Sequence, residues 1–110
     1  MTFISSEKLV AHELVPGFHA KFVHTDTLTI GYITAIKGGV LPQHHHFNQQ
    51  ITNVIQGELE MTVDGKTTIL KSGMVAVIPP NAKHSAVALT DCQIIDVFQP
   101  VREDYKNLDK

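Results

Sequence analysis

Three histidines and a glutamine stand at spacings that suit a metal site. His44 and His46 are two residues apart, so on an extended strand both side chains point to the same face of a sheet. Gln50 follows four residues after His46, and His84 lies far downstream behind its own turn residues. Imidazole nitrogens and an amide oxygen are ligands for divalent cations. The sequence therefore predicts one divalent metal ion, and nickel, zinc, iron and manganese all suit these donors.

One carboxylate interrupts an otherwise apolar strand that the pattern predicts near the C-terminus. Alternation places Asp96 and Phe98 on one face of this strand, and Ile95 and Val97 on the other. A carboxylate buried among such neighbours is unfavourable unless it is paired. Two interpretations stay open. Asp96 either forms a salt bridge or a hydrogen bond to a turn, or it is an acid–base group that faces the metal.

Arg102 and Phe98 each have a structural and a functional interpretation. A guanidinium can bind a substrate carboxylate through two parallel hydrogen bonds. Alternatively, Arg102 pairs with Glu103 or Asp104 at the surface. Phe98 is either a core residue or a platform for a substrate. The residue pattern alone leaves both questions open.

The other histidines show no partner pattern. His45 lies between two candidate ligands, so on a strand its side chain points to the opposite face. His12, His19 and His24 are expected to be exposed.

Short strands must position these residues, because turn signals recur and the segments between them alternate in polarity. The expected strands cover residues 18–23, 27–36, 51–56, 59–63, 66–70, 74–78, 84–89 and 93–99. Asp64-Gly65 predicts a two-residue hairpin. Helical tendency is limited to residues 5–12 and to the segment after Pro100. Many short strands with frequent turns predict an all-β sandwich or barrel with six to eight main strands.

Size and composition predict one globular domain over residues 1–110, with a core over about 16–99 and a polar C-terminal tail over 100–110. The net charge is −2 and no basic stripe is present, which argues against nucleic acid as a partner. No apolar run has membrane-spanning length and no signal peptide is recognisable, so no membrane partner is expected. Cys92, the single cysteine, fits a reducing cytoplasm.

The first candidate motif resembles that of the cupins. The cupin motif is a glycine, five residues, His-x-His, three or four residues, glutamate, six residues and glycine. Here Gly38, His44, His46, Gln50 and Gly57 keep every spacing, with glutamine in place of glutamate. A neutral amide oxygen adds no negative charge, so a bound cation would remain a stronger Lewis acid toward an anionic substrate.

The second cupin motif is a glycine, five residues, Pro-x-Gly, two residues, histidine, three residues and asparagine. Gly73, Pro79, Asn81, His84 and Ala88 occupy these places. Asn81 replaces a glycine where the turn needs positive φ, and asparagine tolerates that conformation. Two motifs in order and in register imply a cupin-type double-stranded β-helix, or jelly-roll barrel.

Among cupins, the chain resembles the small KdgF type of pectin and alginate breakdown. Gln50 as fourth ligand and the segment 96–105, similar to an Asp-x-Phe-x-Pro-x-Arg-Glu-Asp ending, carry this resemblance. It implies ketonisation of 4,5-unsaturated uronates by metal-assisted proton transfer. The roles that it implies are acid–base group for Asp96, carboxylate binding for Arg102, and a place near the substrate for Phe98.

Two other functions stay open from the sequence. A metal-dependent dioxygenase would use the same ligands with a redox metal such as iron. A non-catalytic cupin would bind a sugar or another metabolite without turnover. Small cupins are commonly homodimers, and the apolar face that carries Ile95 and Val97 could form such an interface.

Overall fold

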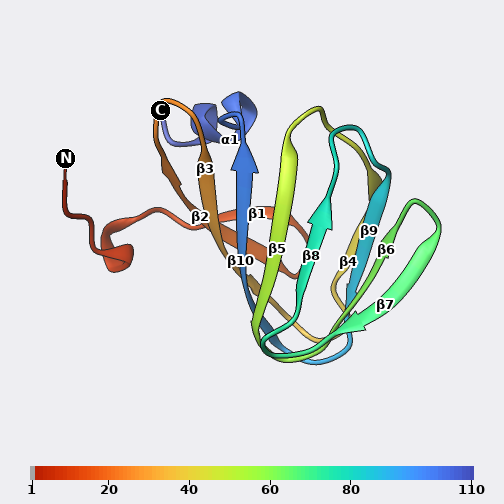
Figure 1. Ribbon diagram of the computed structural model, residues 1–110. Helices are drawn as coiled ribbons and strands as arrows, with labels where there is room; N and C mark the ends of the chain where they lie inside the picture. Colours follow the sequence, from red (N-terminus) through yellow and green to blue (C-terminus); the bar gives the residue numbers. More distant parts are fainter. Residues whose placement is uncertain (1) are drawn as a thin grey trace.

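The chain folds into two antiparallel sheets that face each other (Figure 1). The computed structural model describes residues 2–110. The larger sheet has the strand order β1-β2-β3-β10-β5-β8, and the smaller has the order β4-β9-β6-β7. The strands are β1 (His12–Val15), β2 (Phe18–His24), β3 (Thr29–Ala35), β4 (Val40–His44), β5 (Gln49–Gln56), β6 (Leu59–Val63), β7 (Lys66–Leu70), β8 (Val75–Ile78), β9 (His84–Ala88) and β10 (Cys92–Gln99). A 3₁₀ turn, η1 (Ser6–Lys8), precedes them, and helix α1 (Glu103–Leu108) follows β10.

The core lies between the sheets and follows from the alternation along each strand. In β10, Ile94, Asp96 and Phe98 are buried, whereas Ile95 and Val97 on the other face are only partly covered. Burial of one face of each sheet against the other is the main source of stability for such a fold. The expectation of an all-β jelly-roll barrel is confirmed.

Ten strands are present, so the prediction of six to eight was too low. The two unpredicted strands are β1 and β4. Strand β1 has four residues, and β4 contains Pro42 and mostly exposed side chains, so neither shows the alternation that marks a half-buried strand. The helical tendency expected after Pro100 is confirmed, because residues 103–108 form α1. What the sequence did not predict is that Tyr105 of this tail packs against the core. None of the helices formed by residues 2–110 is long and apolar enough for a membrane span.

Two turns that the sequence singled out have the predicted backbone. Asp64 and Gly65 both have positive φ and connect β6 to β7, as a two-residue hairpin requires. Asn81 has φ 65° and leads into β9, which begins at His84. The positive-φ turn therefore lies just before the strand whose first residue is a candidate ligand.

Candidate metal centre

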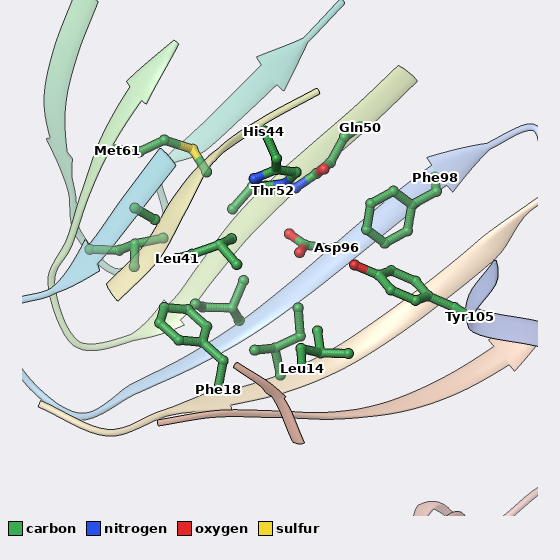
Figure 2. Close-up of a pocket in the computed structure, with 14 residues that line it drawn as sticks. Leu14, Phe18, Leu41, His44, Gln50, Thr52, Met61, Asp96, Phe98 and Tyr105 are labelled. Carbon is green, nitrogen blue, oxygen red and sulfur yellow. The ribbon is translucent and has the colours of Figure 1, made fainter. Parts of the chain in front are cut away.

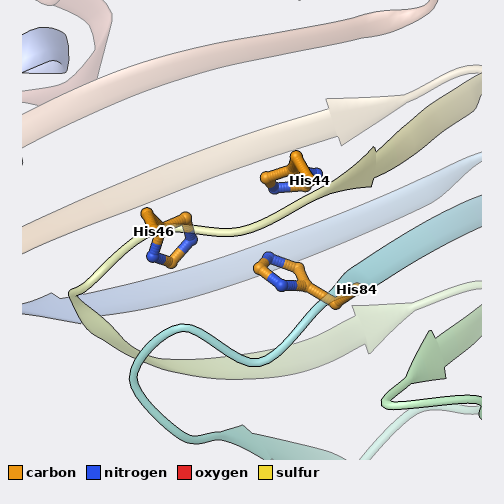
Figure 3. Close-up of side chains that lie close together, drawn as sticks. All are labelled: His44, His46 and His84. Atoms are coloured by element: carbon orange, nitrogen blue, oxygen red, sulfur yellow. The ribbon is translucent and has the colours of Figure 1, made fainter.

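Strand pairing brings the three candidate histidines together (Figure 3). His44 is the last residue of β4 and pairs with His84, the first residue of β9. His46 lies just beyond the end of β4. One ring nitrogen from each histidine lies within 4.8 Å of the others. His45 is exposed, as its position between them predicts.

Each of the three rings is held by a backbone carbonyl. The Nδ1 atoms of His44, His46 and His84 lie 2.8, 3.0 and 2.9 Å from the carbonyl oxygens of Pro42, Asn48 and Ala82. A carbonyl can only accept, so each Nδ1 carries the proton and each Nε2 presents its lone pair. This is the tautomer that a metal-binding imidazole needs.

Gln50 supplies a fourth donor beside the histidines. Its Oε1 atom lies 3.0 Å from Nε2 of His46, and its Nε2 atom donates to Oγ1 of Thr52 at 2.9 Å. Thr52 therefore fixes which end of the amide faces the cluster. The four predicted ligands thus come together from β4 (His44), the segment after it (His46), β5 (Gln50) and β9 (His84).

The electrostatics of the cluster suit a cation. Burial lowers the pKa of His84 to about 4, and it also lowers the pKa of His46, with the Arg102 guanidinium adding to the effect. Both rings are therefore neutral near pH 7. Within the described chain, Nε2 of His84 is buried and has no hydrogen-bond partner. A buried nitrogen without a partner is unfavourable in the absence of a ligand. These residues fit a divalent metal ion.

A small cavity adjoins the cluster and extends between the sheets (Figure 2). Its volume of about 30 Å³ is roughly two to three times what a single water molecule needs. The polar side chains that line it are His44, Gln50, Thr52, Asp96 and Tyr105, and the rest of the lining is apolar.

Asp96 points into this cavity, on the face of β10 that alternation predicts. The residue is 7% exposed, and its Oδ1 atom has no hydrogen-bond partner among residues 2–110. Burial raises the pKa of Asp96 to about 6, although the side chains of Thr52 and Gln50 and the charge of Arg102 oppose the shift. A carboxyl group with a pKa near neutrality can both take up and release a proton. Among residues 2–110, Asp96 forms no salt bridge. Its role as an acid–base group stays a prediction.

Arg102 forms an ion pair with Asp104, one of the two partners that the sequence offered, but the Arg102 side chain is buried and does not lie at the surface. Its Nε and Nη2 atoms donate to the two carboxylate oxygens of Asp104 at 2.9 and 2.7 Å. The guanidinium carbon lies 3.8 Å from the ring centre of Tyr105 and 4.8 Å from that of Phe98. Nη1 is buried without a partner in the described part of the chain. One donor of Arg102 is therefore left for another group.

Phe98 is a buried residue that borders the metal cluster. Its side chain is 2% exposed, and its ring meets the His46 ring edge to face, with the centres 5.8 Å apart. It also lines the cavity. The structure places Phe98 where the core and the site meet, and its role as a platform for a substrate stays a prediction.

Several residues at or near the site were not identified from the sequence. Thr52 could have been found, because it lies two residues after Gln50 on the same face of β5. Tyr105 carried no local signal. His12 and His24 were expected to be exposed, but both are partly buried and contact Asp109 just after α1 at 2.6 and 3.3 Å.

Comparisons with known proteins agree with this geometry. Residues 23–98 match the family model described as "Cupin domain". The chain is 31% identical over 96 residues to the pectin degradation protein KdgF of Dickeya dadantii, covering 84% of this chain and 87% of that protein.

Two solved structures are similar over almost the whole chain. KdgF from a Halomonas species has a TM-score of 0.88 at 31% identity, with 96% of this chain and 98% of that chain covered. An RmlC-like cupin from Shewanella frigidimarina has a TM-score of 0.90 at 29% identity, with 96% of both chains covered. The chain therefore belongs to the cupin family, in which it resembles the KdgF type.

Proposed function

We propose that this protein is a metal-dependent enzyme that converts 4,5-unsaturated uronates into linear keto-sugar acids. The observation that carries the proposal is the place of Asp96. Its carboxyl group lies buried in the cavity that adjoins the three-histidine cluster and faces Gln50, which borders both. A carboxyl group of raised pKa beside a cation site is the pair that metal-assisted proton transfer needs. The similarity to proteins named KdgF supports the substrate class.

The reaction is an isomerisation in which one proton changes place. The hydroxyl group on C1 of the closed sugar loses its proton as the bond between C1 and the ring oxygen breaks, which leaves an aldehyde at C1. The enol at C5 becomes a ketone when C4 gains a proton. Atoms and electrons balance without an oxidant or reductant.

Four side chains are proposed as ligands of one divalent ion, which is nickel, zinc, iron or manganese. They are His44, His46, Gln50 and His84. When bound, such an ion polarises a substrate oxygen and stabilises the negative charge that develops on it.

Residues of the chain supply the remaining functions. Asp96 moves the proton, since it is the titratable carboxyl group that lines the cavity. Arg102 holds the substrate carboxylate through its unpaired Nη1 atom, or through the whole fork once Asp104 is displaced. Phe98 forms an apolar wall beside the sugar ring.

We also propose a homodimer that works in the cytoplasm. On the outer face of the larger sheet, five β-branched residues lie in register across five strands, and they are Val23, Ile30, Val97, Ile51 and Val77. Such a continuous apolar row can pair with the same row of a second copy about a two-fold axis. Light scattering of the wild-type protein and of Val97→Asp tests this, with a dimer expected only for the wild type.

The proposed cytoplasmic location rests on Cys92. Its thiol is free and buried, which suits a reducing compartment.

The decisive test combines metal analysis with turnover. Protein purified without an affinity tag is expected to contain one equivalent of a divalent ion and to consume 4,5-unsaturated galacturonate or guluronate without oxygen uptake. Asp96→Asn should keep the metal and lose about 100-fold or more in turnover, as the removal of a proton-transfer group does. Full turnover by Asp96→Asn contradicts its role. Oxygen-dependent turnover favours a dioxygenase, and binding without turnover favours a metabolite-binding cupin.

A further inference from the structure

The cavity contains one polar side chain to which the reaction above gives no function. His44 and Gln50 are proposed metal ligands, Thr52 orients the Gln50 amide, and Asp96 moves the proton. Tyr105 is the remaining polar residue of the lining, and it comes from α1 rather than from either sheet. In Figure 2 its hydroxyl group points into the cavity toward Asp96, opposite the Gln50 amide.

The Tyr105 ring is held on several sides. It stacks on Phe22 with the ring centres 4.5 Å apart, and it meets Phe98 edge to face at 5.7 Å. The Arg102 guanidinium lies against it at 3.8 Å from the ring centre. Phenylalanine would satisfy all of these ring contacts equally well. The ring packing therefore does not require the hydroxyl group, which places a hydrogen-bonding atom near the Arg102 side chain and beside the buried carboxyl group of Asp96.

The segment that carries Tyr105 is anchored at its far end. Asp109 accepts hydrogen bonds from both His12 and His24, and α1 packs on β2. The phenol thus reaches the cavity from a helix that is fixed at both ends, by the Arg102 and Asp104 pair and by Asp109. A hydroxyl group so held loses little conformational freedom when a ligand binds it.

The cavity is too small for a monosaccharide, because its volume of about 30 Å³ suits roughly two or three water molecules. A sugar acid must therefore displace lining atoms as it enters. Tyr105 stands on a short helix and its ring contacts Phe22 of β2 and Phe98 of β10. Asp96 and Thr52, in contrast, stand on interior strands of the larger sheet. The Tyr105 hydroxyl group therefore adds a polar atom to the cavity from outside the two sheets.

We propose that the Tyr105 hydroxyl group binds the sugar acid directly, as a substrate-contacting group that α1 contributes to the site. This inference rests on the proposed uronate chemistry. The burial that raises the pKa of Tyr105 keeps the phenol neutral, so it can donate to a sugar oxygen as well as accept. A substrate that carries hydroxyl groups is thereby distinguished from an apolar acid of the same size.

Binding of D-galacturonate, a saturated uronate that cannot ketonise, tests the inference by calorimetry. Tyr105→Phe should bind it between about twofold and about tenfold more weakly than the wild type, as the loss of one hydrogen bond predicts. Tyr32→Phe, which changes the other tyrosine, exposed on β3, should bind it unchanged. In Tyr32→Phe the single tyrosine is Tyr105, so D-galacturonate should shift its ultraviolet absorption.

Equal affinity of Tyr105→Phe and the wild type overturns the inference, and so does the absence of any binding or of the absorption shift. Thermal unfolding verifies that Tyr105→Phe is folded. If unsaturated uronates are not turned over but galacturonate binding depends on Tyr105, the proposed function fails and this inference stands. If they are turned over and binding is independent of Tyr105, the reverse holds.

Discussion

Oε1 of Gln50 lies 3.0 Å from Nε2 of His46, so the amide oxygen and the imidazole lone pair are already adjacent before any cation binds. The other end of the amide donates to Thr52. Without that acceptor, the amide could rotate and present its NH₂ group, which cannot bind a cation. The glutamine that replaces the usual glutamate of the motif thus depends on a neighbour that orients it.

Thr52→Val is therefore expected to weaken metal binding by about 10–100-fold, the usual effect of removing a residue that orients a ligand. The measurement is competition with a coloured chelator. Thr62→Val is a matched control, because the Thr62 hydroxyl group pairs with Thr67 at a partly exposed position of β6, away from the candidate ligands. Unchanged affinity of Thr52→Val would show that the amide keeps its orientation without Thr52.

Removal of a ligand should have a larger effect. We expect His84→Ala to lower metal affinity by more than about 100-fold, since even the loss of an orienting partner reaches that range. His45→Ala is the control from the same motif, because His45 is exposed and faces away from the cluster. Elemental analysis of both variants checks this. Metal retained at wild-type affinity in His84→Ala would exclude His84 as a ligand.

His84 should also make the metal-free protein sensitive to acid. Its pKa is about 4 in the folded chain, below the ordinary value of 6.5, so the unfolded chain binds more protons between these values. Stability from this group is present above pH 6.5 and is lost as the pH falls toward 4, by about 3 kcal/mol in all. Urea unfolding with a chelator present, at pH 7.5 and 4.5, should show a smaller loss for His84→Asn than for the wild type.

The effect of Asp96 on folding stability has the opposite dependence on pH, in an overlapping pH range. Its pKa is about 6 in the folded chain against an ordinary value of 3.8, so folding is disfavoured as the pH rises through this range. The penalty reaches about 3 kcal/mol above pH 6. Asp96→Asn should therefore stabilise the metal-free protein by up to that amount at pH 7.5 and by little at pH 4. Equal stability of the two proteins at pH 7.5 would mean that the carboxyl group is not desolvated.

The clustering of the candidate metal ligands and the inward direction of Asp96 could be predicted because their signals are local. His44, Gln50 and His84 stand in two short motifs, and alternation within one strand places Asp96 inside. The place of Tyr105 could not be predicted in this way. It depends on how the chain after β10 returns over β2, and on Asp109 meeting histidines at the other end of the sequence. A polar tail gives no periodic signal for such a contact.

Arg102→Lys should raise KM for an unsaturated uronate by about tenfold while kcat changes little. A lysine keeps the charge but lacks the planar fork that binds carboxylates. Asp104→Asn is the informative partner variant, because it releases the fork from its ion pair. We expect it to lower KM and to change stability by less than about 1 kcal/mol, since Asp104 is mostly exposed. A KM that is the same in all three proteins would place Arg102 outside the substrate site.

Substitution of Gly57, the last residue of the first motif, should destabilise the fold because of a backbone contact. Gly57 has φ +95°, and a Cβ atom there would lie 2.2 Å from the carbonyl oxygen of Asp91. Gly57→Ala must therefore displace the turn before β10, the strand that carries Asp96. Gly38→Ala is the matched control, with φ +87° but nothing within 4 Å of the added atom. We expect Gly38→Ala to lose about 1–2 kcal/mol, and Gly57→Ala to lose at least about 2 kcal/mol more. Equal losses by urea unfolding would show that the Asp91 turn yields freely, so that the spacing between Gly57 and the ligands would not constrain the site.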